Sequence, residues 1–338
     1  MQAYIIRRLI LIIPTLLLVT LIVFFTARFI PGSVIDQMIA TMGAESSVAD
    51  IELTTKVMQE KLGLDIPIWL QYGRWLGVAP YPDKGPTYPA AGFNGVLEGN
   101  LGQSLWTGRY IIEELRNRFP ISLELGLIGI FSAVLYSIPI GIYSGIRQDT
   151  PGDYIGRTIA ILAISVPSFW LGTMVVVYPS IWWNWMPPIE YAPIFKNFSA
   201  NVVQFIIPGV ILGLVAGGAE MRIMRTMMLE VLRQDYIRTA WSKGLSERVV
   251  VMRHALKNAL IPVVTMIGLR VPILISGSIV METIFNLPGI GRLEIEAITK
   301  RDYPIISGVN LIVASFVLIV NLIVDLTYAW LDPRVKYK

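Results

Sequence analysis

Six long runs of apolar residues constrain this chain more than any other feature, because each is about as long as a bilayer is thick. A helix needs about 20 apolar residues to cross the hydrocarbon layer. Lipid offers no partner to backbone amides, so such a run must satisfy its own hydrogen bonds as a helix. We therefore predict an all-α polytopic membrane protein with six transmembrane helices, at residues 9–27, 121–146, 159–178, 203–219, 260–280 and 305–331.

Composition agrees with a membrane location and argues against a nucleic-acid partner. Hydrophobic residues make up 54% of the 338 residues and charged residues 15%, with a mean hydropathy of +0.61. A soluble domain carries about 25% charged residues. The net charge of +4 comes from cations that lie between the apolar runs, where membrane topology places them. We expect the lipid bilayer, and no nucleic acid, as a partner.

The distribution of Lys and Arg predicts how the chain is oriented. Cytoplasmic loops carry an excess of these residues. The segment 222–258, between the fourth and fifth runs, is therefore predicted to be cytosolic, and both termini with it. Its basic residues are Arg222, Arg225, Arg233, Arg238, Lys243, Arg248, Arg253 and Lys257.

Three domains follow from this order of runs and loops. Residues 1–30 form an N-terminal transmembrane anchor; a signal peptide is the alternative, but residues 28–31 offer no small-residue cleavage site. Residues 31–118 are too long for an ordinary connection, so we expect a small extracytoplasmic insertion. It contains two amphipathic helices, at 51–62 and 68–76, and a loop rich in Pro and Gly at 78–99. Residues 119–338 form the transmembrane domain.

An aromatic connection joins the third and fourth runs. Trp182, Trp183, Trp185 and Tyr191 suit the headgroup layer, because an aromatic ring with a polar edge satisfies both apolar and wet surroundings. We interpret them as an interfacial belt. A platform on which a substrate stacks is the alternative.

A charged helix-turn-helix at 235–262 is the clearest functional feature. Gly244 can adopt the left-handed conformation that ends a helix, and Ser246 is a good N-cap for the next. Tyr236, Ala240 and the glycine turn are expected to form a small-residue surface that docks in a groove on a partner. A solvated charged loop is the alternative. The candidate docking residues are Arg238, Thr239, Ala240, Lys243, Gly244, Leu245 and Ser246.

Three residues inside the runs are candidates to line a translocation path. Arg270 lies about 15 Å deep in the fifth run, at 1.5 Å per residue, and a charge at the bilayer centre must face protein or water. A structural pair with Glu220 or Asp325 is the alternative. Asn310 and Asn321 on the sixth run either line the path or join helices by hydrogen bonds.

The chain lacks the residues of several kinds of chemistry. It has no cysteine and one histidine, His254, which leaves little for a metal or a nucleophile. It has no GxxxxGK[ST] loop to cradle phosphates, so any ATPase must be a separate subunit. We predict no catalytic, cofactor or metal site on this chain.

Several segments resemble, in the same order, the dipeptide/oligopeptide branch of ABC-importer permeases. They are RRLILIIPTLLLVTLIVFF, ISVPSFWLG, DYIRTAWSKGLSERVVVMRHALKNALIP, FNLPGIGRLEIEAITKRDYP and IVDLTYAWLDPRVKY. The resemblance implies a permease subunit in a bacterial or archaeal cytoplasmic membrane. It implies four further partners: a second permease, two ATP-binding subunits that hold ATP and Mg, and an extracytoplasmic substrate-binding protein.

The resemblance also narrows the function without fixing the substrate. Members of the branch carry di- and oligopeptides, and others carry oligosaccharides, nickel or glutathione. The family commonly has an uncharged polar residue where this chain has Arg270, and charged residues where it has Asn100 and Gln103. An ion-coupled secondary carrier and an intramembrane enzyme are the other classes. Neither explains the charged helix-turn-helix.

Overall fold

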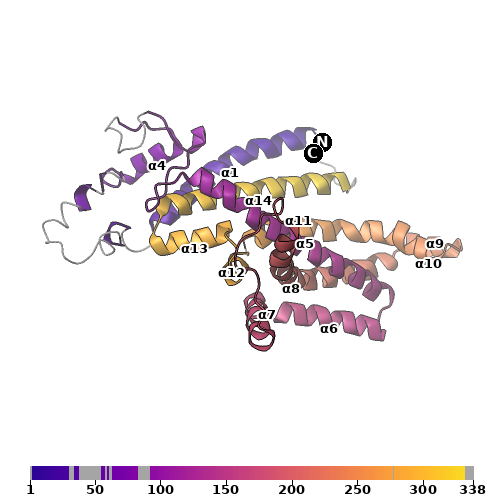
Figure 1. The fold of residues 1–338 in the computed structure, drawn as a ribbon. Coiled ribbons are helices and arrows are strands. Elements are labelled where there is room, and N and C mark those ends of the chain that lie inside the picture. The colour runs from indigo at the N-terminus through magenta and orange to yellow at the C-terminus, as the bar shows by residue number, and fades with distance from the viewer. Residues whose placement is uncertain are drawn as a thin grey trace. The chain divides into compact units, whose positions relative to one another are not determined.

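The computed structural model describes residues 2–29, 34–37, 55–57, 59–60, 63–82, 92–276 and 278–331. These residues form helices and loops, with two isolated β-bridges and no strand in the described ranges (Figure 1). The helices are α1 (Gln2–Arg28), α4 (Ile68–Leu76), η1 (Val96–Glu98), α5 (Ile111–Ile146), α6 (Pro151–Ser165), α7 (Ser168–Trp183), α8 (Phe198–Leu232), α9 (Asp235–Ser242), α10 (Glu247–Val249), η2 (Val250–Ala255), α11 (Leu256–Ser276), α12 (Ile279–Ile284), α13 (Ile290–Lys300) and α14 (Tyr303–Leu331).

Within the described residues, five stretches of helix are long and apolar enough to cross a membrane, which confirms an all-α polytopic membrane protein. A sixth span exists if α6 and α7 count as one, but these helices meet at 89°. The single helix predicted over 159–178 is therefore wrong. Pro167 has no amide proton and forces the preceding residue out of the helical region, and Val166 is extended there, at φ −91° and ψ 121°.

One compact unit comprises residues 6–119 and 293–315, so it contains the whole of the predicted insertion 31–118. Helix α4 has the bounds predicted for it, and Tyr72 on α4 lies 2.9 Å from the Thr20 hydroxyl on α1. Of the helix predicted over 51–62, residues 55–57 and 59–60 are described, and they are helical. The remainder of that prediction, and the basic residues after 331, lie outside the described residues.

Asp302 organises the loop before α5 within the same unit. The Ser104 hydroxyl donates to its Oδ2 at 2.6 Å, and the Leu105 amide donates to its Oδ1 at 3.2 Å. Burial raises the pKa of the Asp302 carboxyl, and these hydrogen bonds offset part of that rise.

The other compact unit comprises residues 1–5, 120–292 and 316–338. Helices α5 and α8 approach closely because glycines face each other: a Cβ on Gly213 would lie 2.6 Å from the carbonyl oxygen of Gly129. Tyr136 on α5 donates its hydroxyl to the Leu214 carbonyl on α8. Such contacts, with no room for a side chain between backbones, hold α8 in one register against α5.

The turn after α12, at residues 285–292, is arranged around a buried carboxylate. Glu282 on α12 is fully buried, and its Oε1 accepts from the hydroxyls of Ser122 and Ser278, both at 2.6 Å. Its Oε2 accepts from the amide of Arg292 at 3.0 Å. The chain continues from this turn into helix α13.

Candidate functional site

The predicted helix-turn-helix is present, and it is built from α9, α10 and the π-helical η2, which we call the α9–η2 module (residues 235–255). Helix α9 ends at Ser242 with Lys243 as its C-cap, and Gly244 follows at φ +73°. This left-handed backbone is the one predicted for Gly244, and an ordinary side chain disfavours it. Ser246 occupies the N-cap position of α10 at φ −64° and ψ 150°, without a side-chain cap. Its carbonyl accepts from the amides of Val249 and Val250 instead.

One side of α9 belongs to the protein core. Ile237 is fully buried and Ala240 is 6% exposed. They pack in a cluster with Val250 and Val251 of η2 and with Met224 and Met228 of α8. The sequence suggested that Ala240 lies on an exposed docking surface, but in the structure its side chain is buried. Residues three apart on a helix share a face, and the face that carries Ile237 is the apolar one.

The rest of α9 and the turn after it carry exposed aromatic and basic groups. Tyr236 is 43% exposed and Trp241 44%, and Arg238, Thr239, Lys243 and Ser246 are exposed as well. Leu245 is partly buried against the core cluster. The pair between Arg238 and Asp235, at 3.5 Å, has side chains 75% and 97% exposed, so it leaves the guanidinium available to a partner.

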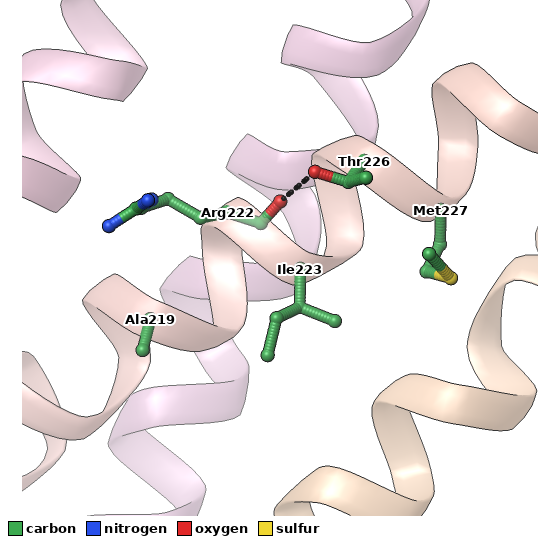
Figure 2. Close-up of a pocket in the computed structure, with 5 residues that line it drawn as sticks. All are labelled: Ala219, Arg222, Ile223, Thr226 and Met227. Atoms are coloured by element: carbon green, nitrogen blue, oxygen red, sulfur yellow. Dashed lines mark hydrogen bonds between the residues drawn. The ribbon is translucent and has the colours of Figure 1, made fainter.

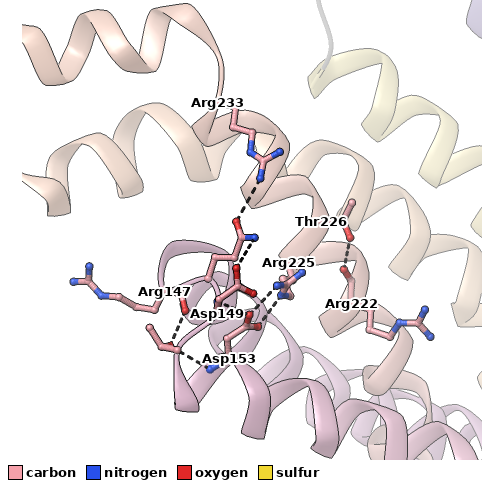
Figure 3. A network of polar contacts seen from close by, with 9 residues as sticks. Arg147, Asp149, Asp153, Arg222, Arg225, Thr226 and Arg233 are labelled. Atoms are coloured by element: carbon pink, nitrogen blue, oxygen red, sulfur yellow. Dashed lines mark hydrogen bonds and ion pairs between the residues drawn. The ribbon is translucent and has the colours of Figure 1, made fainter.

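A polar network joins α8 and its C-cap to α6 and the turn before it. Figure 3 shows the central pair, in which Arg225 on α8 donates to both oxygens of Asp153 on α6, at 2.7 and 2.8 Å. Arg233 donates to the Gln148 side chain at 3.4 Å. Glu247 of the module lies 3.0 Å from Arg147, but these side chains are 44% and 53% exposed, so water weakens this pair.

A shallow depression lies on the surface of α8. Figure 2 shows its lining residues Ala219, Arg222, Ile223, Thr226 and Met227. The Thr226 hydroxyl donates to the carbonyl of Arg222 at 2.9 Å, so it is engaged within the helix. The depression offers one guanidinium and no carboxylate, which favours an anion over a cation.

The three path candidates lie in different surroundings. Arg270 on α11 is partly exposed, its Nε has no hydrogen-bond partner in the described part of the chain, and its charge interacts with that of Glu220. Asn310 donates to Glu294 at 2.8 Å and to the carbonyl of Ile306 at 2.9 Å, which favours the alternative that it joins helices. Burial raises the pKa of the Glu294 carboxyl, and this hydrogen bond opposes the rise. Asn321 on α14 is partly buried.

Sequence reasoning missed Asp153 and Glu282, two carboxylates that accept several hydrogen bonds each. Both are fully buried. A usable signal was present: acids are rare in a chain this apolar, and a buried carboxylate must find donors. Thr150 also marks Asp153 as a first-turn residue, because the Thr150 side chain caps α6 at the Asp153 amide.

Comparison with known proteins places the fold in a family. Residues 137–337 match the inner membrane component of binding-protein-dependent transport systems, and residues 1–126 match the N-terminal part of such components. The chain belongs to this family. It is the permease subunit of an ABC importer, which confirms the resemblance found in its sequence.

Full-length relatives agree with this family. The dipeptide transport system permease protein DppB of Alkalihalophilus pseudofirmus is 36% identical over 357 residues, and DppB of Escherichia coli strain K12 is 35% identical over 361. The glutathione transport system permease protein GsiC of Salmonella paratyphi A is 34% identical over 338 residues. Each alignment covers 100% of both chains. The binding-protein-dependent permease family implies ATPase and substrate-binding partners and a multi-pass membrane location.

Proposed function

We propose that this permease forms half of a translocation path for di- and oligopeptides. A second permease subunit forms the other half, two ATP-binding subunits dock on the two permeases, and an extracytoplasmic protein delivers the substrate. ATP and Mg bind to the ATP-binding subunits. Relatives named for dipeptide and for glutathione support peptide as the substrate class. Oligosaccharides and nickel remain the alternatives.

The single observation that carries the coupling role is the two-sided construction of the α9–η2 module. Its core side is anchored on α8 and α11 through Met224, Met228 and Val263. Its exposed residues include Arg238, Lys243 and Trp241. A rigid module that exposes basic and aromatic residues and packs firmly on two helices can transmit a partner's movement to those helices.

The test is ATP-driven uptake into proteoliposomes that contain all subunits. We expect uptake of dipeptides that requires the substrate-binding protein and ATP. The same assay with oligosaccharide, glutathione or nickel separates the substrate classes. A complex that transports without ATP, under an ion gradient alone, would refute the importer mechanism proposed for this chain.

We place the α9–η2 module and both termini on the cytosolic side, and residues 31–118 outside, from the bias of Lys and Arg. The chain contains no cysteine, so single cysteines report topology without background. We expect an impermeant maleimide to label Thr107→Cys from outside and Ser242→Cys only from inside. The reverse pattern would overturn this orientation.

We propose that Arg270 faces the path and attracts the carboxylate of a peptide. Its Nε lacks a hydrogen-bond partner in the described part of the chain, and a guanidinium binds a carboxylate well where water is scarce. Arg270→Gln should slow uptake of a free dipeptide more than uptake of its C-terminal amide. Equal slowing of both, or failure to assemble, would instead make Arg270 a structural partner of Glu220.

A further inference from the structure

Asp153 on α6 and Arg225 on α8 form a buried ion pair, a contact that helices do not need in order to insert into a membrane. Asp153 is fully buried, and the Arg225 side chain is 17% exposed. Both carboxylate oxygens are occupied by the guanidinium, and Oδ2 also accepts from the Asp149 amide at 3.1 Å. Figure 3 shows this arrangement at the start of α6. A bidentate pair of this kind fixes angle as well as distance.

The helices on either side of this pair are in direct backbone contact. A Cβ added to Gly218 on α8 would lie 2.8 Å from the carbonyl oxygen of Ala160 on α6. A Cβ on Gly156 of α6 would lie 3.1 Å from the methyl group of Met221 on α8. With the ion pair at one end and this close approach along their length, α6 and the second half of α8 form one body.

Stability alone does not account for a buried pair. Removing two charges from water is expensive, and well-packed apolar residues of similar volume often serve stability as well or better. What apolar residues lack is the direction of the two hydrogen bonds. We therefore ask which elements this ion pair fixes relative to each other.

The pair lies between the α9–η2 module and the bent helices α6 and α7. Met224 and Met228, on either side of Arg225 in α8, pack in the same cluster as Ile237 of the module. At its other end α6 leads through the 89° bend into α7. There, a Cβ on Gly172 would lie 3.1 Å from the Met281 methyl of α12. A movement of the module can pass through α8, α6 and α7 to α12 only if α6 moves together with α8.

We propose that Asp153 and Arg225 are positioning residues for transport, which make α6 and α7 follow the α9–η2 module during the ATP cycle. The proposal rests on the coupling role given to that module above. It adds a second element, the bent pair α6–α7, to the parts of the permease that move with the ATPase.

The test compares a buried and an exposed ion pair at the same end of the helices. Asp153→Asn removes the charge with little change of shape, and Asp153→Leu with Arg225→Met replaces the pair by apolar side chains. Arg147→Ala is the matched control, because the pair of Arg147 with Glu247 is 53% and 44% exposed and contributes little in water. Each complex is assayed for substrate moved per ATP hydrolysed.

We expect both changes at Asp153 to lower the substrate moved per ATP by on the order of tenfold, with hydrolysis retained, and Arg147→Ala to behave as wild type. If the Leu/Met variant assembles and keeps the wild-type ratio, the pair is only structural and the proposal is overturned. It is also overturned if that variant fails to assemble, because the pair is then a requirement for folding. A wild-type complex with no ATP-driven uptake would instead refute the proposed function.

A second readout follows the two helices directly. Spin labels on Tyr154→Cys of α6 and Glu230→Cys of α8, both exposed positions, report the distance between them in the resting and the ATP-bound complex. We expect a narrow distribution that is the same in both states, and a broad or shifted one in Asp153→Asn. An unchanged distribution in that variant would show that the pair does not join α6 to α8.

Discussion

The α9–η2 module and the aromatic connection (residues 182–197) lie in one compact unit, and they use opposite constructions. The module buries its apolar side chains, Ile237 and Ala240 among them, and exposes basic groups. The connection exposes its apolar side chains, with Trp182 64%, Trp183 69% and Phe195 99% exposed. The first suits a protein partner, and the second suits lipid.

The two regions also differ in what holds their backbones. The module is held by apolar packing on α8 and α11. The connection is held by two buried amides of α8: Asn201 donates to the carbonyl of Ala192 at 3.0 Å, and Gln204 donates to that of Pro188 at 3.1 Å. Tyr191, predicted as part of the aromatic belt, packs instead on Phe205 within the core. A region can thus be fixed in place while its side chains remain free to face another phase.

The largest effect is expected from breaking the core of the α9–η2 module. Ile237→Ala leaves a cavity where the side chain is fully buried, and such changes typically cost about 2–5 kcal/mol. We expect faster hydrogen exchange across 235–255 and loss of ATP-driven uptake. Met252→Ala, in the same module but 56% exposed, is the control. If both variants exchange and transport alike, apolar packing does not hold the module.

A smaller effect is expected from the turn of the module. No atom lies within 4 Å of a Cβ added to Gly244, so Gly244→Val is penalised only by the left-handed backbone, by roughly 1–2 kcal/mol. We expect uptake to fall several-fold, with normal amounts of protein in the membrane. Gly244→Asn should transport nearly as wild type, since Asn tolerates that backbone. Equal activity of the two variants would show that the turn's conformation is not needed.

The long helices and the turn at Gly244 could be predicted from sequence, because they depend on residues close together in the chain. Apolar length predicts the long helices, and a glycine between two helical patterns predicts the backbone of Gly244. The bend at Val166 was also available locally, from the proline that follows it. It was missed because hydrophobicity is continuous through 159–178 and was given more weight than the proline.

The contacts that position the site could not be predicted in this way, because they join distant residues. Asp153 and its partner Arg225 are 72 positions apart, and Ser122 and Glu282 are 160 apart. Which side of α9 is buried depends on what α8 offers it, so Ala240 was assigned to the wrong face. Local pattern shows that α9 is amphipathic, and only packing shows which residues a partner can reach.

The smallest effect is expected from changes in the aromatic connection. This experiment tests whether its aromatic side chains face lipid or bind substrate. We expect Trp182→Phe with Trp183→Phe to leave uptake within about twofold of wild type, since a ring at the interface contributes little to a rigid, hydrogen-bonded backbone. Lipids brominated near the headgroup should quench part of the tryptophan fluorescence of the wild type. The double variant should lack that quenched part. Trp75→Phe, in the other compact unit, is the control for the loss of a tryptophan as such. A selective fall in the uptake of aromatic peptides, with no change in lipid quenching, would show instead that Trp182, which stacks on Tyr178 at 4.8 Å, forms a platform for substrate.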